Sequence, residues 1–211
     1  MAKYIDLTAP LNDGDPGMPM DPKISISWHC TLDTLGYNLS RLTTSLHQGT
    51  HIDAPKHFFK DGETIDHIAL DRVIVRAIKI ELPEKTNSTF IHPEDLEPYA
   101  DKIKPGMAVL LHTGWDKKFP DPVFFNEFPS ITAETAQWLA DHKVGIIGMD
   151  MPTPGSDWKV VHETLLGNDV LVVEGLANME DITADEFTFL ALPLKLAGRS
   201  GSPIRAVAIE D

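Results

Sequence analysis

The strongest constraint on the fold is a set of apolar, β-branched runs of strand length that recur along most of the chain. They occupy residues 73–82, 107–113, 144–150, 169–174 and 205–209. Two further segments, residues 23–29 and 39–47, alternate apolar and polar side chains, which is typical of half-buried strands. The chain is therefore expected to be rich in β-structure.

Helical signals are fewer. Residues 132–142 begin with Thr132, a good N-cap, and residues 160–166 repeat apolar side chains at helical spacing. A short helix is expected over residues 93–99, and residues 183–186 match a capping box that would begin another. Because strands and helices do not alternate in a doubly wound pattern, we predict an α/β fold: a mixed, β-rich sheet with interspersed helices.

Composition limits the class of protein. The 211 residues are 42% hydrophobic and 24% charged, which suits one globular domain over residues 1–211. The net charge of -14 argues against binding to nucleic acid or an anionic membrane. The single cysteine, Cys30, can form neither an internal disulfide nor a thiolate zinc site. The beginning of the chain does not resemble a signal peptide and no apolar run approaches the roughly 20 residues of a membrane span, so we expect a cytoplasmic protein.

Histidine placement is the most informative functional signal. Four potential ligands fall within the eleven residues 47–57, namely His47, His51, Asp53 and His57. All are odd-numbered, so an extended segment would project them to one side, and Gly49 and Pro55 disfavour a helix. Two imidazoles and a carboxylate make a mixed nitrogen and oxygen site suited to Zn²⁺, Mn²⁺ or Fe²⁺. The alternative is a scatter of surface histidines.

Two distant residues could complete such a site. His162 lies on the predicted helix 160–166, and Glu174 ends the predicted strand 169–174. A carboxylate at the end of a buried strand is unfavourable unless it is paired, protonated or bound to a metal. On the residues alone, a strand-end glutamate that reaches solvent is the competing interpretation.

The pattern HxGTHxDAPxHF at residues 47–58 resembles the signature of the cyclase family of metal-dependent hydrolases, which includes kynurenine formamidases and isatin hydrolases. The likeness continues outside the signature, at residues 5–11, 111–115, 147–150, 174–178, 192–196 and 201–207. The resemblance implies a swivelling β/β/α domain, usually in a homodimer whose pockets are partly walled by the partner subunit.

The resemblance also implies particular roles. The residues that match His47, His51 and Asp53 hold a first metal ion in the family, and the aspartate bridges to a second ion held by the counterparts of His162 and Glu174. This chain keeps both second-site residues, which favours two divalent ions, Zn or Mn, per chain. The counterpart of His57 is a catalytic acid/base rather than a ligand.

The chemistry expected of such a site is hydrolysis of a small amide, formamide or lactam. A divalent ion lowers the pKa of bound water from near 16 to about 7, and His57 would act as general acid/base for the metal-bound hydroxide and the leaving amine. Phe58, Phe59 and Trp115 are candidate walls for an aryl substrate. An arylformamidase of tryptophan catabolism is the first expectation. An isatin-type hydrolase of cyclic esters or lactams is the second, because residues 151–154 depart from the formamidase pattern.

Two rival functions fit part of the pattern. His51-x-Asp53 with His162 matches the facial triad of a non-haem Fe(II) oxygenase. However, no arginine that could hold a 2-oxoacid follows His162 before Arg199. A non-catalytic metal-binding protein is the other rival, and His57 argues against it because a pure binding site has no use for an additional histidine.

Overall fold

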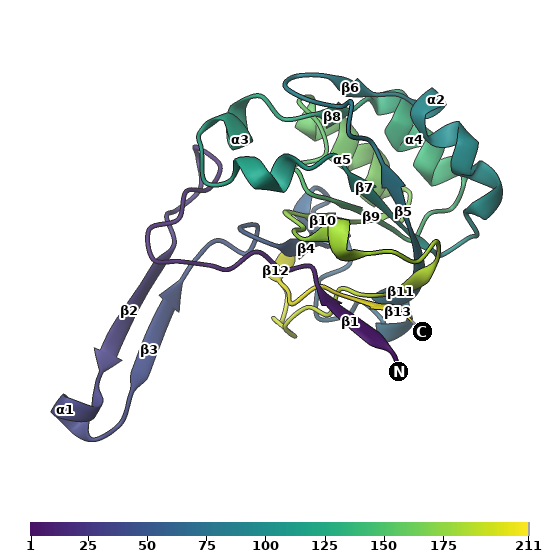
Figure 1. Cartoon of the computed structure of the whole chain (residues 1–211). Coiled ribbons are helices and arrows are strands. Elements are labelled where there is room, and N and C mark those ends of the chain that lie inside the picture. Colours follow the sequence, from purple (N-terminus) through teal and green to yellow (C-terminus); the bar gives the residue numbers. More distant parts are fainter. Residues whose placement is uncertain (211) are drawn as a thin grey trace.

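A computed structural model describes residues 1–210 (Figure 1). Within these residues the largest sheet has nine strands in the order β1-β13-β11-β5-β7-β9-β10-β4-β12. Their bounds, in that order, are Lys3–Asp6, Val207–Glu210, Phe187–Leu190, Ile74–Glu81, Ala108–His112, Ile146–Met149, Leu171–Glu174, His51–Asp53 and Gly201–Pro203.

The sheet is mixed, as predicted. β5, β7, β9 and β10 pair in parallel at its centre, and every strand outside them pairs antiparallel to its neighbours. The five apolar runs of the sequence correspond to these four parallel strands and to β13. The predicted α/β class, with a β-rich mixed sheet, is confirmed.

Both faces of the parallel strands are buried. Alternate residues of β7 enter two different apolar clusters, with Val109 and Leu111 in one and Ala108 and Leu110 in the other. The first cluster includes residues of α4 (Ala133–Asp141) and α5 (Trp158–Gly167), which lie on one side of the sheet in Figure 1. The second cluster, which includes Phe187, is formed by the alternate residues of the strands. Strands covered on both sides read as continuous apolar runs, which explains the pattern in the sequence.

The helices largely follow the sequence signals. Thr132 caps α4, with its hydroxyl accepting from the Thr135 N–H at 3.2 Å, and α5 covers the second predicted helix. Residues 93–99 form α2 (Pro93–Leu96) and the start of the 3-10 helix η3 (Glu97–Lys102). No helix in residues 1–210 has the length and apolar character needed to cross a bilayer.

The capping-box prediction at residues 183–186 is wrong. The N–H groups of Thr183 and Ala184 donate to the carboxylate of Glu210 on β13, at 2.5 and 2.9 Å, and no helix begins there. A partner distant in sequence replaces the local cap. The remaining short elements are α1 (Leu32–Leu35), α3 (Val123–Asn126), η1 (Pro55–His57), η2 (Leu70–Arg72), η4 (Trp115–Lys118), η5 (Met179–Asp181) and the pair β6 (Phe90–Ile91) and β8 (Ser130–Ile131).

A two-stranded arm projects away from the rest of the molecule (Figure 1). It consists of β2 (Ser25–Cys30) and β3 (Leu39–Thr43), paired antiparallel and joined through α1. The strand predicted over residues 39–47 therefore ends four residues early, since its partner strand β2 begins opposite Thr43 and the chain then turns back toward the sheet. The arm carries exposed apolar side chains, namely Trp28, Leu32, Leu35, Tyr37, Leu39 and Leu42.

Candidate metal centre

Strand pairing alone brings three of the predicted ligands together. β4 lies between β10 and β12, and in its antiparallel pair with β10 His51 is directly opposite Glu174. Directly opposed residues project to the same face of a sheet, and so do residues two apart on one strand. His51, Asp53 and Glu174 therefore share one face at the end of β10.

His47 reaches the same place by a different route. The extended conformation predicted for residues 47–57 is found only over His51–Asp53, whereas residues 46–50 form bends. Gly49 has a φ of +67°, which is unfavourable for residues with a Cβ, and this allows the chain to fold back on itself. The predicted convergence of the odd-numbered side chains is present, but for His47 its cause is a turn rather than strand alternation.

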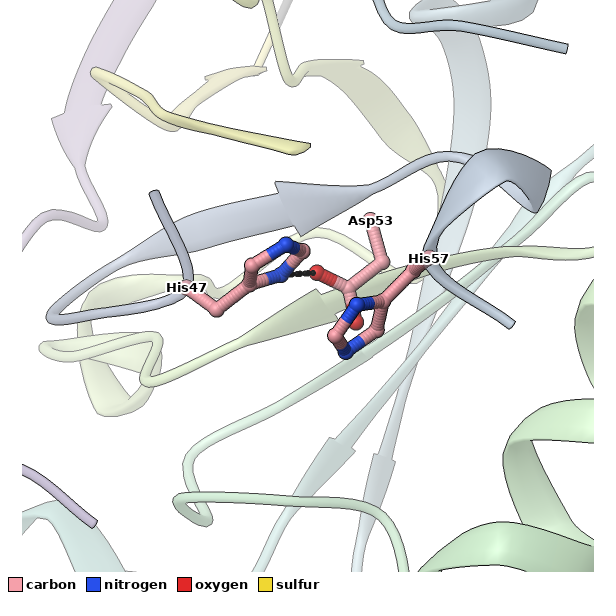
Figure 2. Close-up of side chains that lie close together, drawn as sticks. All are labelled: His47, Asp53 and His57. Atoms are coloured by element: carbon pink, nitrogen blue, oxygen red, sulfur yellow. Dashed lines mark hydrogen bonds and ion pairs between the residues drawn. The ribbon is translucent and has the colours of Figure 1, made fainter. Parts of the chain in front are cut away.

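The imidazole of His47 is held at both nitrogens. Its Nδ1 lies 2.5 Å from Oδ1 of Asp53, as Figure 2 shows, and its Nε2 lies 2.8 Å from Oγ of Ser200. Gly201 leaves the space for this ring, because a β-carbon there would lie 2.6 Å from it. The approach of β12 to β4 thus fixes His47 as well as extending the sheet.

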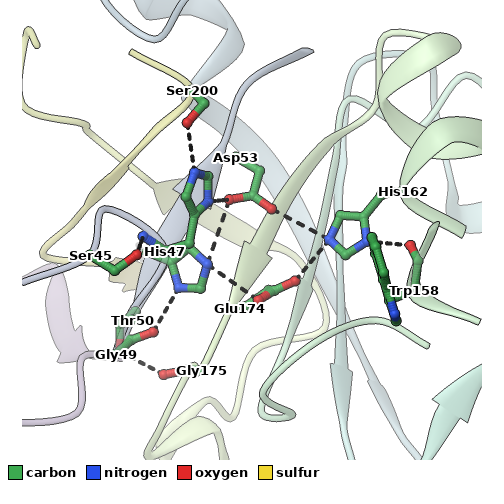
Figure 3. A network of polar contacts seen from close by, with 11 residues as sticks. Ser45, His47, Gly49, Thr50, Asp53, Trp158, His162, Glu174, Gly175 and Ser200 are labelled. Atoms are coloured by element: carbon green, nitrogen blue, oxygen red, sulfur yellow. Dashed lines mark hydrogen bonds and ion pairs between the residues drawn. The ribbon is translucent and has the colours of Figure 1, made fainter. Parts of the chain in front are cut away.

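His162 enters the cluster from α5, on the other side of Glu174. Its Nε2 lies 3.2 Å from Oε1 of Glu174 and 3.5 Å from Oδ2 of Asp53 (Figure 3). Its Nδ1 donates to the carbonyl of Trp158 at 2.6 Å. A histidine whose Nδ1–H is bound to a carbonyl presents the Nε2 lone pair in its neutral form, as metal-binding histidines do.

His51 is oriented in the same way. Its Nδ1 donates to the Gly49 carbonyl at 2.9 Å, and its Nε2 lies 3.2 Å from Glu174 and 3.5 Å from Asp53. Two histidines from different elements thus direct equivalent nitrogens at the same pair of carboxylates.

Electrostatics in the metal-free protein is a balance of two acids and two bases. Burial lowers the pKa of both histidines, but the carboxylates of Glu174 and Asp53 outweigh it and raise the pKa to about 9 for His51 and about 10 for His162. Burial raises the pKa of both carboxyls, but the surrounding histidines reverse this and lower the pKa of Asp53 and of Glu174 below its usual range. Protonated imidazoles therefore neutralise the carboxylates where a cation could do so.

The residues fit a divalent metal. His51 Nε2 and Asp53 Oδ2 are buried atoms without a hydrogen-bond partner, and leaving such atoms unsatisfied costs about 1–3 kcal/mol each. Imidazole and carboxylate ligands suit Zn²⁺ or Mn²⁺. Two groups have ligand atoms within 4.8 Å of one another and share Asp53, namely His51, Asp53 and Glu174, and His47, Asp53 and His57.

His57 differs from the other histidines. It ends η1, is exposed, and stacks on His47 with ring centroids 3.7 Å apart and planes at 16° (Figure 2). Partial burial, with repulsion from His47 and His162, outweighs the attraction of Asp53 and lowers the pKa of His57 to about 4. The ring is therefore neutral near pH 7 and able to accept a proton.

The three predicted wall residues lie in different surroundings. Phe58 stacks on His162, with centroids 4.6 Å apart and planes at 12°, whereas Phe59 is exposed beside α5. Trp115 is 3% exposed within the helix-side core, where its indole N–H donates to the Phe124 carbonyl at 3.0 Å.

A cavity of about 200 Å³ opens beside the cluster, and none of these three residues lines it. His47 and His51 form part of its wall, and much of the remainder is apolar, from Met18, Ile24, Phe119, Phe124, Phe125 and Leu176. Residues 15–18, which belong to no predicted helix or strand, also line it. Two polar wall residues, Gln48 and Asp116, were not singled out from the sequence, because Gln48 occupies a variable position of the pattern at residues 47–58 and Asp116 lies just outside residues 111–115.

The chain is similar to known proteins over nearly its whole length. Residues 5–156 match the family described as "Putative cyclase". The kynurenine formamidases of Bacillus cytotoxicus and Bacillus anthracis are each 30% identical to it, in alignments that cover 98% of this chain and 97% of each relative.

Solved structures share the fold. Isatin hydrolase A from Ralstonia solanacearum superposes with a TM-score of 0.92 at 23% identity, covering 100% of this chain and 92% of that one. A structure described as a potential metal-dependent hydrolase with cyclase activity superposes with a TM-score of 0.83 at 27% identity, covering 100% and 99%. The first likeness, at this identity, concerns the fold alone.

Proposed function

Because the chain belongs to the cyclase family, we propose that it is a metal-dependent hydrolase that cleaves the C–N bond of a small aryl amide or formamide. The matches confirm the family resemblance and the cyclase-like fold. The observation that carries the proposal is the buried group of histidines and carboxylates around Asp53, in which two polar atoms have no hydrogen-bond partner. The neutral and exposed His57 lies beside it. A three-ligand oxygenase site would leave His47 and Glu174 without a role.

The chain's own residues supply positioning and proton transfer. A bound divalent ion contributes an acidified water and a polarised carbonyl. His57 takes a proton during attack and returns it to the departing amine. Its pKa of about 4 in the metal-free protein leaves the ring neutral near pH 7, so that it can accept this proton. The cavity wall holds the aryl group and excludes water around it.

Two ions per chain, zinc or manganese, are the metal content we propose. Oδ1 of Asp53 lies 2.5 Å from His47 and 3.5 Å from His51, whereas its Oδ2 lies 3.5 Å from His162. These contacts support a carboxylate shared between two ions. His47 and His51 would hold one ion with Asp53, and His162 and Glu174 would hold the other.

The substrate we favour is the formamide of an aryl amine, as in tryptophan catabolism. The Bacillus relatives at 30% identity carry the name kynurenine formamidase, and the phenylalanines of the cavity suit an aromatic ring. The second candidate is a cyclic amide of the isatin type, because residues 151–154 depart from the formamidase pattern.

A homodimer is the assembly we propose. The β2–β3 arm exposes apolar side chains, including Trp28 and Leu42, and in Figure 1 it projects away from the rest of residues 1–210. Exposed apolar patches of this kind mark protein interfaces. Sedimentation of the wild type and of a Leu32→Asp, Leu35→Asp variant tests this, and a wild-type monomer would contradict it. The single domain and the cytoplasmic location stay predictions.

The deciding experiment is an activity panel on the purified protein loaded with Zn²⁺ or Mn²⁺. N-Formylkynurenine, formanilide and isatin are offered with and without a chelator. We expect the formamides to be hydrolysed and chelation to abolish the activity. A fully loaded protein that hydrolyses none of them would contradict the proposed function.

A further inference from the structure

Three phenylalanines form the aromatic part of the cavity wall beside the metal centre. Phe119, Phe124 and Phe125 all line the cavity, and each ring contacts the other two. The ring centroid of Phe124 lies 5.5 Å from that of Phe119 and 4.9 Å from that of Phe125, with planes at 83° and 84°. Edge-to-face contacts of this kind hold the rings together, so a displacement of Phe124 displaces the whole aromatic wall.

The backbone that carries these rings has few hydrogen bonds to the rest of the protein. It comprises residues 119–126, which include the short helix α3. Within residues 1–210, the hydrogen bonds of this segment join residues at most four positions apart, with one exception. Local hydrogen bonds shape the segment, but they do not fix its position against the core.

The exception is a hydrogen bond from Trp115. Its indole N–H donates to the carbonyl of Phe124 at 3.0 Å, and both groups are buried. Trp115 packs within the helix-side core and does not itself line the cavity. It therefore links the core to the residue that contacts both other rings of the aromatic wall.

We propose that Trp115 is a positioning residue for the aryl group of the substrate. Its indole N–H fixes the Phe124 carbonyl, and the ring of Phe124 aligns its two aromatic neighbours. A wall that is ordered before binding loses less conformational entropy when the substrate enters. The inference rests on the proposed function and deepens it, because recognition of the aryl group then depends on a residue outside the cavity wall.

Trp115→Phe tests this role, because it removes the indole N–H and keeps an aromatic ring in the core. The Phe124 carbonyl then stays buried without a donor, so residues 119–126 open more easily. Hydrogen exchange measured by mass spectrometry should be about tenfold faster in peptides that cover this segment and unchanged in β4 and β10. Calorimetry on the metal-loaded protein should show that 2-aminoacetophenone, an aryl ketone without a cleavable amide, binds about tenfold more weakly, the value of one good hydrogen bond.

Trp138→Phe is the matched control. The Trp138 ring packs on the same apolar cluster, and its indole N–H donates to Glu97 at 2.9 Å. The same substitution thus removes a comparable hydrogen bond on α4, and it should change neither the exchange of residues 119–126 nor the affinity for the ligand. Equal effects of the two variants, or no effect of Trp115→Phe, would overturn the positioning role. A wild type that does not bind 2-aminoacetophenone would overturn it as well.

A measurement on the wild type covers the case in which Trp115→Phe does not fold. NMR resolves the indole N–H groups of the four tryptophans, and substitution of the other three identifies that of Trp115 by elimination. A ligand that binds only the ordered wall, at ten times its dissociation constant, should slow the exchange of this N–H about tenfold. An exchange rate that 2-aminoacetophenone leaves unchanged would contradict the proposal.

Hydrolysis distinguishes failure of this inference from failure of the proposed function. With formanilide, Trp115→Phe should raise KM about tenfold and leave kcat and metal content near the wild-type values. If the wild type hydrolyses no formamide, the hydrolase proposal fails, while hydrogen exchange and ligand binding still decide the role of Trp115. If both proteins hydrolyse formanilide with equal KM and bind the ketone equally, the hydrolase stands and the positioning role is wrong.

Discussion

Two clusters of histidine and carboxylate lie at the ends of neighbouring parallel strands. One surrounds Asp53 and Glu174, where β10 ends, and the other contains His112 at the end of β7 and Asp150 just after β9. Their residue types are nearly the same, and both have ligand atoms within 4.8 Å. They differ in what their lone pairs already do.

In the second cluster the acceptors of the central carboxylate, Asp150, are used, although Oδ1 of the third member, Asp116, has no hydrogen-bond partner. Asp150 receives N–H groups from Thr113, Gly114 and Trp115 and the Thr113 hydroxyl, at 2.6 to 3.1 Å, so it anchors the turn after β7. In the first cluster Asp53 Oδ2 has no hydrogen bond. The comparison teaches that the free lone pairs of the central carboxylate, rather than residue composition, distinguish a candidate metal site from a structural cluster.

Replacing Asp53 gives the largest expected effect. Asp53→Ala removes the carboxylate shared by both ligand groups, so we expect both ions and all measurable hydrolysis to be lost. Metal content by mass spectrometry and activity are measured together, with Asp150→Asn as the matched change in the other cluster. A variant that retained two ions per chain would remove Asp53 from its bridging role.

His57→Ala separates chemistry from metal binding within the first cluster. We expect kcat to fall about 10²- to 10⁴-fold, the usual contribution of a general acid/base, while the metal content stays near that of the wild type. Parallel loss of metal and activity would instead make His57 a ligand, as its distance from His47 and Asp53 allows.

The pH dependence of metal binding tests the charge balance. In the metal-free protein His51 and His162, with pKa values of about 9 and 10, are protonated at pH 7, so binding should release about two protons. The apparent affinity should rise about 100-fold per pH unit between pH 7 and 8. Calorimetry in buffers of different ionisation enthalpy counts the protons, and zero release would refute the protonated pair.

The same pKa values give a stability prediction for the metal-free protein. Both histidines have a folded pKa above the unfolded value of about 6.5, so their stabilisation is complete below that pH and disappears as the pH rises through 9 to 10. Urea unfolding of the chelated protein should therefore show lower stability at pH 10 than at pH 7.

Asp150→Asn gives the smallest effect, on stability only. Loss of charge-assisted hydrogen bonds to the turn should lower the free energy of unfolding by about 1.5–3 kcal/mol at pH 7.5. Burial raises the pKa of Asp150 to about 6, above its unfolded value, so protonation stabilises the folded wild type below pH 6 and its difference from the variant should grow there. Urea unfolding at both pH values measures it. If this variant lost bound metal, the second cluster would also take part in metal binding, and the contrast between the two clusters would be wrong.

Much of the strand framework was readable from the sequence because both faces of β5, β7, β9 and β10 are buried and leave continuous apolar runs. Failures came from long-range contacts. Residues 183–186 look like a local cap, but Glu210 supplies the acceptor from another strand. The end of β3 at Thr43 depends equally on where its partner strand stops.

The ligand set was readable as a pattern, but its assembly was not. Strand alternation predicts that His51 and Asp53 share a face, and it gives no reason for His47 to join them after a turn at Gly49. The meeting with Glu174 depends on β4 lying beside β10, which no spacing in the sequence encodes. The position of Gln48 in the cavity wall has no signature in the sequence, because the lining of a cavity depends on how distant segments pack.

The approach of β12 to β4 has a consequence for how the enzyme matures. Gly201 lies opposite Asp53, and Ser200 holds His47, so residues separated by about 150 positions must meet before the first histidine is in place. Contacts this distant in sequence form slowly, because a long loop must close first. The position of His47 is therefore fixed only after residues 200 and 201 have packed beside residues 47–53.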